Sequence, residues 1–416
     1  MAAQRVPAVQ AAVRIMKDEG VDIVFGCPGA ALLPLYTAME EAGGIEHYAV
    51  RHEEAAAHMA DGWARTGDGR VGVAAVASGP GAARLVTGLY AARQDAVPLV
   101  CVTARPPDGP HRRSGSLRHG AGDSPDLIRL AGPVTKRAER IEDPARIPGA
   151  FREAFRIARE GRPGPVLIDV PADVAAAEIA DDAGSALDFR FRQQACRTAA
   201  AVRPDVPASD GAASPVLAEI DRILGAGSAS DPAVYVVTGS PGAAATADTP
   251  RPRHHLRTGT GLPGWEVPAA IGVRKALESR GEQDAEVVAV IEGHGLSFLA
   301  EELSGAARYG VPFVLLALTP GHPGSARAAA GGHPRNVPVG FPDEQLTDHV
   351  KLVEAYGCAG RGLADPADLR SAVEWARKEA VSTRRPVLVE VPVERAVPAA
   401  CGGPVDGAVR EYSFGP

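Results

Sequence analysis

Short apolar runs alternate with longer segments of helical periodicity along most of the chain. The runs are rich in Val, Ile, Leu and Ala and are bounded by Gly or Pro, which is typical of buried strands. The segments between them place apolar residues three and four positions apart, as amphipathic helices do. This alternation predicts an α/β fold with parallel sheets and crossover helices. The clearest runs are VDIVFGCPG, VGVAAVASGPG and VPLVCVTA in the first part and PAVYVVTGSPG, AEVVAVIEG and VPFVLLAL in the second.

The two parts of the chain end in similar segments. RPGPVLIDVPADV (162–174) matches RRPVLVEVPVERAV (384–397), which indicates two copies of one α/β unit. Between them, FRQQACRTAAAVRPDVPASDGAASP is rich in Ala, Pro, Ser and Gly and lacks periodicity, as linkers do. We expect a first unit over 1–190, a linker over 191–211, a second unit over 212–400 and a tail over 401–416.

Composition narrows the class of protein. The 416 residues carry 44 basic against 51 acidic side chains, a net charge of −7, which gives no electrostatic footprint for nucleic acid. The N-terminal segment MAAQRVPAVQAAVRIMKDEG is interrupted by charges, so it predicts an amphipathic helix over about the first 20 residues rather than a signal peptide. With no apolar run long enough to span a bilayer, we expect a cytoplasmic protein without a membrane partner, and its Ala, Gly and Arg content suggests a bacterial source.

The five cysteines are odd in number, widely scattered and never in a CxxC pair, so they indicate neither a disulfide framework nor a zinc site. A different feature points to a ligand. Gly293-His294-Gly295 follows the run AEVVAVIEG directly, and ligands of open α/β sheets bind where strand ends and helix N-termini converge. The alternative is that the glycines only permit a tight turn and that His294 is exposed.

Longer segments carry a family resemblance. VFGCPGAALLPLYTAM, AVRHEEAAAHMADGWAR and ASGPGAARLVTGLYAARQDAVPLVCVTA resemble the N-terminal domain of thiamine-diphosphate enzymes of the acetolactate synthase and glyoxylate carboligase group. GTGLPGWEVPAAIGV, FLAEELSGAARYGVPFVLL and RRPVLVEVPVER are similar to their C-terminal domain. The resemblance implies two doubly wound parallel-sheet domains, with the linker in place of the family's middle domain. It also implies a site between the N-terminal domain of one subunit and the C-terminal domain of its partner, hence a homodimer or a dimer of dimers.

The resemblance assigns a catalytic role to Glu53. It matches the carboxylate that hydrogen-bonds the cofactor's aminopyrimidine ring and promotes formation of the reactive ylid. Glyoxylate carboligase-like proteins have an apolar residue there, so Glu53 follows the acetolactate synthase pattern. The alternative is a solvated glutamate at a helix start. Cys27 could act as a nucleophile with His52 or Glu53 as its base, or it could be a small residue in a tight turn. We expect His58 to be a packing residue.

The metal-binding motif of the family is altered. Mg²⁺ takes oxygen ligands in octahedral geometry, and the family supplies them from a Gly-Asp-Gly turn and a downstream Asn-Asn pair. The corresponding residues here are Gly293-His294-Gly295 and Thr319-Pro320. Pro263 also stands where the family has the bulky residue that bends the cofactor. We therefore expect no Mg²⁺ site and absent or weak binding of Mg²⁺–thiamine diphosphate, a cofactor expected only from the resemblance. A softer metal held by His294 and His322 is an alternative.

Two basic segments are candidates for binding a substrate anion, because guanidinium groups clamp carboxylates. The resemblance places both in loops near the active site, although a solvated basic loop is the alternative. The candidate residues are Arg112, Arg113, Arg253, His255 and Arg257. The turns that would face a cofactor contain Pro28, Gly29, Gly79, Gly81, Gly239, Gly261, Gly293, His294 and Gly295.

These features lead to one main hypothesis and one alternative. The protein is expected to be a diverged lyase or transferase of specialised bacterial metabolism that acts on a small anionic 2-oxo or 2-hydroxy acid at a dimer-interface cavity. Its chemistry would be carbon–carbon bond formation or cleavage, or acid–base chemistry. The alternative is a cofactor-free or catalytically silent subunit that regulates a full-length relative.

Overall fold

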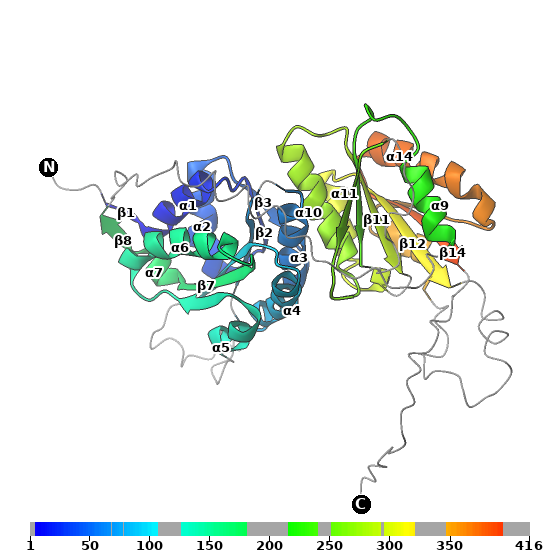
Figure 1. Cartoon of the computed structure of the whole chain (residues 1–416). Helices are drawn as coiled ribbons and strands as arrows, with labels where there is room; N and C mark the ends of the chain where they lie inside the picture. Colours follow the sequence, from blue (N-terminus) through cyan, green and yellow to red (C-terminus); the bar gives the residue numbers. More distant parts are fainter. Residues whose placement is uncertain are drawn as a thin grey trace, which may run out of the picture.

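A computed structural model describes most of the chain as two α/β domains that lie side by side (Figure 1). The expected linker and tail fall outside the described residues, as do Arg112, Arg113, Gly293, His294 and His322. The described stretches are 5–67, 69–77, 79–106, 126–180, 215–239, 251–292, 295–320 and 347–393.

The first domain is built on a six-stranded parallel sheet in the order β3-β2-β4-β5-β7-β6. Its central strands are buried on both faces, which explains their nearly continuous apolar sequences. The strands are β2 Ile23–Cys27, β3 Glu46–Ala49, β4 Gly72–Ala77, β5 Leu99–Arg105, β6 Arg137–Arg140 and β7 Pro165–Pro171; the helices are α1 Ala8–Asp18, α2 Leu33–Ala42, α3 Glu53–Ala64, α4 Pro80–Gln94, α5 Leu127–Ala131, α6 Ile147–Arg159 and α7 Ala172–Ala176.

The second domain repeats this arrangement with the strand order β10-β9-β11-β12-β14-β13, again all parallel. When the strands of each six-stranded sheet are numbered in chain order, both sheets run 2-1-3-4-6-5. The predicted α/β class with two parallel-sheet domains is therefore confirmed, and the matching orders support the predicted duplication. The strands are β9 Val234–Thr238, β10 Arg253–Arg257, β11 Glu286–Glu292, β12 Val314–Pro320, β13 Ala359–Gly362 and β14 Val387–Val393; the helices are α9 Pro215–Leu224, α10 Glu266–Ser279, α11 Glu302–Tyr309, α13 His349–Ala355 and α14 Leu369–Thr383.

A small antiparallel pair lies beside the first sheet. β1 (Arg5–Pro7) pairs with β8 (Glu178–Ala180), so the start of the chain is tied to the end of the first domain. The predicted N-terminal helix is present but begins only at Ala8, directly after this strand. Proline at position 7 fits this boundary, because proline cannot donate a backbone hydrogen bond to continue a ladder and is tolerated at helix starts.

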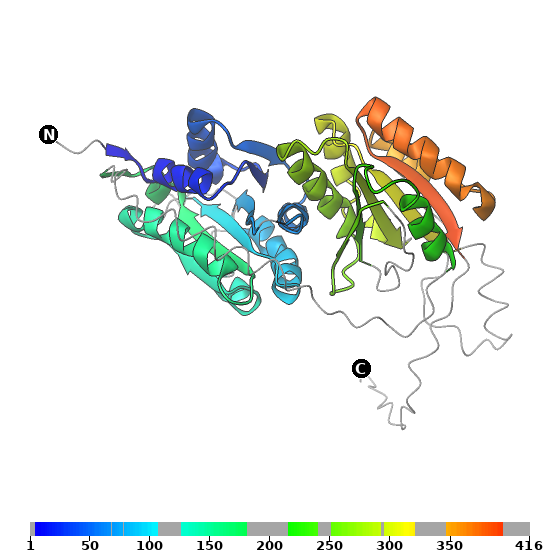
Figure 2. The same ribbon diagram turned by 45° about the horizontal axis from the view of Figure 1, so that its top comes forward.

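The helices form layers around the two sheets. One apolar cluster joins α1, α2 and α6 to one face of the first sheet, and another joins α9 and α14 to one face of the second. The third cluster is shared by both domains: it runs from Phe25 and Leu89 through α3 and α10 to Leu315. Figures 1 and 2 show α3 and α10 at the boundary between the domains. The two domains of one chain thus share a single core.

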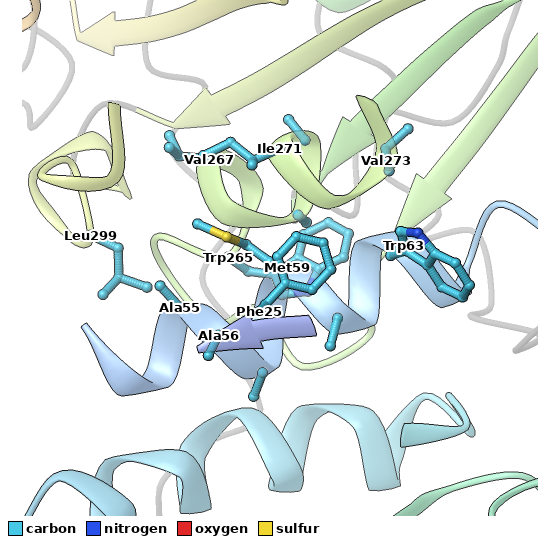
Figure 3. Packing of buried hydrophobic residues seen from close by; sticks show 14 of the residues in the cluster. Phe25, Ala55, Ala56, Met59, Trp63, Trp265, Val267, Ile271, Val273 and Leu299 are labelled. Atoms are coloured by element: carbon cyan, nitrogen blue, oxygen red, sulfur yellow. The ribbon is translucent and has the colours of Figure 1, made fainter. Parts of the chain in front are cut away.

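Small residues allow α3 and α10 to approach closely where they cross (Figure 3). A Cβ atom on Gly272 would lie 1.9 Å from the Met59 carbonyl oxygen, and one on Gly62 would lie 2.2 Å from the Ala269 carbonyl oxygen. Backbone therefore contacts backbone at the crossing, and only glycine fits these two positions. Met59, Trp63 and Trp265 fill the space around it and are almost fully buried.

Candidate active site

Each sheet has a topological switch point where the chain order of the strands reverses, between β2 and β4 in the first domain and between β9 and β11 in the second. Ligands of open α/β sheets bind beyond the carboxyl ends of the strands at such points. Of the predicted residues at the first switch point, Cys27 is the last residue of β2, Pro28 and Gly29 follow it, and Gly79 and Gly81 follow β4. Gly239 and Gly295 follow β9 and β11 at the second.

Glu53 belongs to the first switch point. It is the first residue of α3, and its Oε2 atom accepts a hydrogen bond of 3.0 Å from Nη1 of Arg84 on α4. The Glu53 side chain is 17% exposed, whereas that of Arg84 is 54% exposed. Gly81 makes room for the carboxylate, because a Cβ atom there would lie 2.2 Å from Glu53 Oε1. The acid is thus held in one place, next to a cation that faces solvent.

His52 lies beside Glu53 as the N-cap of α3, where its Nδ1 atom accepts the N–H of Glu54 at 3.3 Å. This contact satisfies one of the free donors at the helix start and fixes its direction. His58, one turn further on, is fully buried and contacts Glu54 Oε1 at 3.3 Å, as a packing residue would. His52 therefore shapes the turn that carries Glu53.

A buried carboxyl group from the second domain holds the same turn. Glu302, the first residue of α11, accepts the backbone N–H groups of Arg51 and His52 on its Oε1 atom, both at 2.8 Å. Its side chain is fully buried, and Oε2 has no hydrogen-bond partner among the described residues. Glu302 was not predicted from the sequence. The turn before Glu53 is thus attached to the second domain of the same chain.

Burial raises the pKa of Glu302 to about 8, although the N–H groups of His52 and Arg51 oppose this shift. The ordinary value is 4.5, so between these two values the folded protein holds a proton that the unfolded chain releases. Near Glu302 lie Glu301, Arg51, Tyr48 and Cys27. Of these, Glu301 raises the pKa of Glu302 and Arg51 lowers it.

We expect the contribution of Glu302 to stability to be complete below pH 4.5 and to be lost as the pH rises to about 8. The slope should reach up to about 1.4 kcal/mol per pH unit. Urea denaturation of the wild type and of Glu302→Gln across this range measures the difference between their free energies of unfolding. Glu354→Gln, an exposed glutamate of α13, is the control and should keep the wild-type slope. Equal slopes in wild type and Glu302→Gln would contradict the expectation.

Cys27 is half-buried at the end of β2, and burial raises the pKa of its thiol, as do the carboxylates of Glu53 and Glu302. Arg84 opposes this shift. An anionic neighbourhood favours the neutral thiol over the nucleophilic thiolate. The environment therefore resembles that of a small packing residue more than that of an activated nucleophile.

The second switch point contains a carboxylate that the sequence analysis did not single out. Glu266, the first residue of α10, is 5% exposed and accepts the N–H of Gly239 on Oε1 at 3.0 Å. A Cβ atom on Gly239 would lie 2.5 Å from this oxygen, and one on Gly295 would lie 3.8 Å from Oε2. Gly261 lies apart, in the loop before α10, with a left-handed φ of 61°. The only available signal for Glu266 was an acidic residue two positions after Gly264.

The adjacent strand β12 ends in Thr319-Pro320, which pair with Pro392 and Val393 of β14. Pro320 supplies neither an amide hydrogen nor a side-chain oxygen. In the described part of the chain, no three His, Cys, Asp or Glu side chains gather closely enough to hold a metal ion. Mg²⁺ needs several oxygen ligands, and the buried side chain of Glu266 already binds the Gly239 N–H that a diphosphate could use. The described residues of this edge do not fit a diphosphate held by Mg²⁺.

The expectation that residues 251–257 form a loop is wrong. Arg253–Arg257 form β10, an edge strand that pairs in parallel with β9. The segment is polar because an edge strand is solvated along one side. His255 on this strand lies with Nε2 3.5 Å from Asp221 Oδ1 of α9. A role for Arg253, His255 and Arg257 in binding a substrate anion stays a prediction.

A buried polar network fixes the loop between β10 and α10. Asp61 of α3 accepts hydrogen bonds from Nε of Arg65 at 2.5 Å and from the indole Nε1 of Trp265 at 3.1 Å. Arg65 also donates to Asp95 at 2.6 Å and to the backbone carbonyl of Arg257. Asp95 in turn accepts the N–H of Gly259 at 3.0 Å. The first domain thereby positions the glycine loop of the second.

Two parallel-sheet domains with glycine turns at both switch points define a protein of the doubly wound α/β class. Residues 7–126 match the family described as thiamine pyrophosphate enzyme, N-terminal TPP binding domain. Residues 238–391 match thiamine pyrophosphate enzyme, C-terminal TPP binding domain. Thiamine pyrophosphate is another name for thiamine diphosphate. The two matches together cover more than half of the chain, and the protein belongs to this family.

The relatives agree with this assignment. The chain is 41% identical over 175 residues to the glyoxylate carboligase of Escherichia coli O157:H7. The aligned residues are 42% of this chain and 28% of that protein. It is 42% identical over 181 residues to the acetolactate synthase of Arthrospira platensis. Here the aligned residues are 43% of this chain and 30% of that protein. The chain thus aligns with less than a third of the length of either relative.

Among solved structures, the chain resembles the thiamine diphosphate-dependent 4-hydroxybenzoylformate decarboxylase of Rhodococcus jostii RHA1. The TM-score is 0.67, the sequence identity is 17%, and the match covers 94% of this chain and 99% of that chain. At this identity the likeness concerns the fold alone. Among the described residues, no helix combines the length and apolar character needed to cross a bilayer.

Proposed function

We propose that the protein is a diverged acetolactate synthase- or glyoxylate carboligase-like enzyme whose acid–base group is Glu53. Its substrate class would be small anionic 2-oxo or 2-hydroxy acids, and binding of Mg²⁺–thiamine diphosphate would be lost or weakened. The observation that supports the proposal most strongly is the confinement of Glu53 by Arg84, by Gly81 and by the turn that Glu302 holds. A carboxylate held in one position by two domains is suited to transferring a proton at one substrate atom.

Arg84 suits the substrate class. Its guanidinium group is half-exposed while it contacts Glu53, so a small carboxylate from solvent can reach it. A substrate carboxylate bound by Arg84 would lie next to the Glu53 carboxylate, which contacts the same guanidinium group. Glu53 would then remove a proton from the carbon next to the substrate carbonyl or hydroxyl. The resulting carbanion would add to the carbonyl carbon of a second 2-oxo acid, whose oxygen would take up a proton, and cleavage of the carbon–carbon bond would be the reverse of this step.

Solvent exchange tests this proposal without requiring the product to be known. Pyruvate and lactate are incubated with the full-length protein in D₂O, and loss of the proton signal next to the functional group is followed by NMR. We expect exchange above the uncatalysed rate, and a reduction of at least about 100-fold in Glu53→Gln. Glu54→Gln, its neighbour in sequence, should stay within about two-fold of the wild type. Equal rates in wild type and Glu53→Gln would overturn the proposal. Absence of exchange in the wild type would favour the silent-subunit alternative.

Gly81 allows a second test that separates position from charge. In Gly81→Ala the added methyl group would occupy the space of Glu53 Oε1, and the carboxylate must rotate away from Arg84. Alanine has a higher helix propensity than glycine, which offsets part of the steric cost. The free energy of unfolding should therefore change by less than about 1 kcal/mol. The exchange rate should nevertheless fall by at least about 10-fold. Gly149→Ala in α6, where an added Cβ meets nothing within 4 Å, is the control. An unchanged exchange rate in Gly81→Ala would contradict the role of this glycine.

A further inference from the structure

The buried side chain of Glu266 lies at the second switch point, where an open α/β sheet typically binds an anion. Glu266 is the first residue of α10, a helix of 14 residues, and its side chain contacts Gly239, which directly follows β9. The hydrogen bond from the Gly239 N–H is 3.0 Å long, and the residue is 5% exposed. Gly295, which begins the segment after β11, lies on the other side of the carboxylate. The group thus lies between the two strands that define the switch point.

Backbone N–H groups at strand ends and the first turn of a helix attract anions, since both carry partial positive charge. In this protein the carboxyl group of a side chain of the same helix, Glu266, accepts such an N–H group instead. The Gly239 N–H is satisfied by Glu266 Oε1, and the glycine is needed because a Cβ atom would lie 2.5 Å from that oxygen. A diphosphate in this place would lose that donor and would have to displace the buried carboxyl group of Glu266.

We propose that the side chain of Glu266 occupies the anion position of the second switch point and thereby excludes diphosphate. The inference rests on the proposed function, in which binding of Mg²⁺–thiamine diphosphate is lost or weakened, and names the residue responsible. It does not depend on the proton transfer assigned to Glu53. The exclusion is local, so removing one side chain should restore affinity for a diphosphate.

The test is calorimetric titration of the full-length protein with inorganic pyrophosphate and with thiamine diphosphate, each with and without Mg²⁺. Glu266→Gly removes the side chain, and Glu266→Gln keeps an oxygen acceptor for Gly239 but removes the charge. We expect no binding by the wild type up to about 1 mM ligand. Glu266→Gly should bind both ligands at least about 10-fold more tightly than the wild type, and Glu266→Gln should lie between them. Glu374→Gln, an exposed residue of α14, matches the change in net charge and should behave as the wild type.

Two results would overturn the inference. One is wild-type binding of thiamine diphosphate in the micromolar range that Glu266→Gly does not improve. The other is folded Glu266 variants, judged by near-UV circular dichroism, that bind pyrophosphate no better than the wild type. If Glu266→Gly does not fold, the inference is tested by comparing the affinities of Glu266→Gln and the wild type for pyrophosphate. Because binding is measured rather than turnover, failure here leaves the exchange assay of Glu53 unaffected, and the reverse also holds.

Discussion

Replacing Gly272 by valine should separate the two domains and destabilise the protein by at least about 3 kcal/mol. The added Cβ atom would lie 1.9 Å from the carbonyl oxygen of Met59 and 2.9 Å from the backbone nitrogen of Trp63. Both are backbone atoms of α3, so no side-chain rotation relieves the contact and the helices must move apart. Urea denaturation followed by circular dichroism measures the loss, and two resolved transitions would report that the domains no longer unfold together.

Two further variants make this expectation specific. Gly272→Ala adds a single methyl group at the same place and should cost less than valine but still more than about 1 kcal/mol. Gly149→Ala, in a helix where the added Cβ meets nothing within 4 Å, should be neutral or stabilising. If Gly272→Ala matched Gly149→Ala, the close crossing of α3 and α10 would not exist in solution.

The fold could be predicted from sequence because its signals are local. The apolar runs correspond to β2, β4, β5, β9, β11 and β12, and the matching segments at the ends of the two parts correspond to β7 and β14. Glycine turns after these runs identified the strand ends at which a ligand is expected. The polar segment RHHLR lacks an apolar run and was expected to be a loop. It nevertheless forms β10, since an edge strand pairs with only one neighbour and is solvated along its other side.

The contacts that hold the site were not predictable in the same way. Glu302 binds the N–H groups of residues 250 and 251 positions earlier in the chain. No periodicity or spacing links positions so far apart, and only the folded chain brings them together. Glu266 gave a weak signal, an acidic residue at a helix start, which is common on solvated helices. Burial against Gly239 distinguishes it, and burial of one side chain cannot be recognised from a single sequence.

Replacing Asp61 by alanine should cost about 3–5 kcal/mol, because it removes one of the two carboxylates that pair with the buried charge of Arg65. Asp61 is fully buried, and it accepts hydrogen bonds from Arg65 at 2.5 Å and from Trp265 at 3.1 Å. Without it, the Arg65 guanidinium keeps Asp95 but loses its nearest carboxylate, and the indole N–H of Trp265 has no acceptor from this network. Urea denaturation at neutral pH measures the loss.

The chain offers a matched control with the same spacing. Glu160 and Arg156 form an ion pair four residues apart, as Asp61 and Arg65 do, but both side chains are more than half exposed. Glu160→Ala should therefore change the free energy of unfolding by less than about 0.5 kcal/mol. Equal effects of the two substitutions would mean that water reaches Asp61.

A double-mutant cycle tests whether this network joins the domains. Asp61 and Arg65 belong to the first domain and Trp265 to the second, so the hydrogen bond between Asp61 and Trp265 crosses the boundary. We expect Asp61→Asn and Trp265→Phe to be coupled by about 0.5–3 kcal/mol. Additive effects would show that the two side chains act independently. Coupling would show that the first domain holds the start of α10, and with it Glu266, in place. The carboxylate that blocks the second switch point would then be positioned by the same domain that carries Glu53.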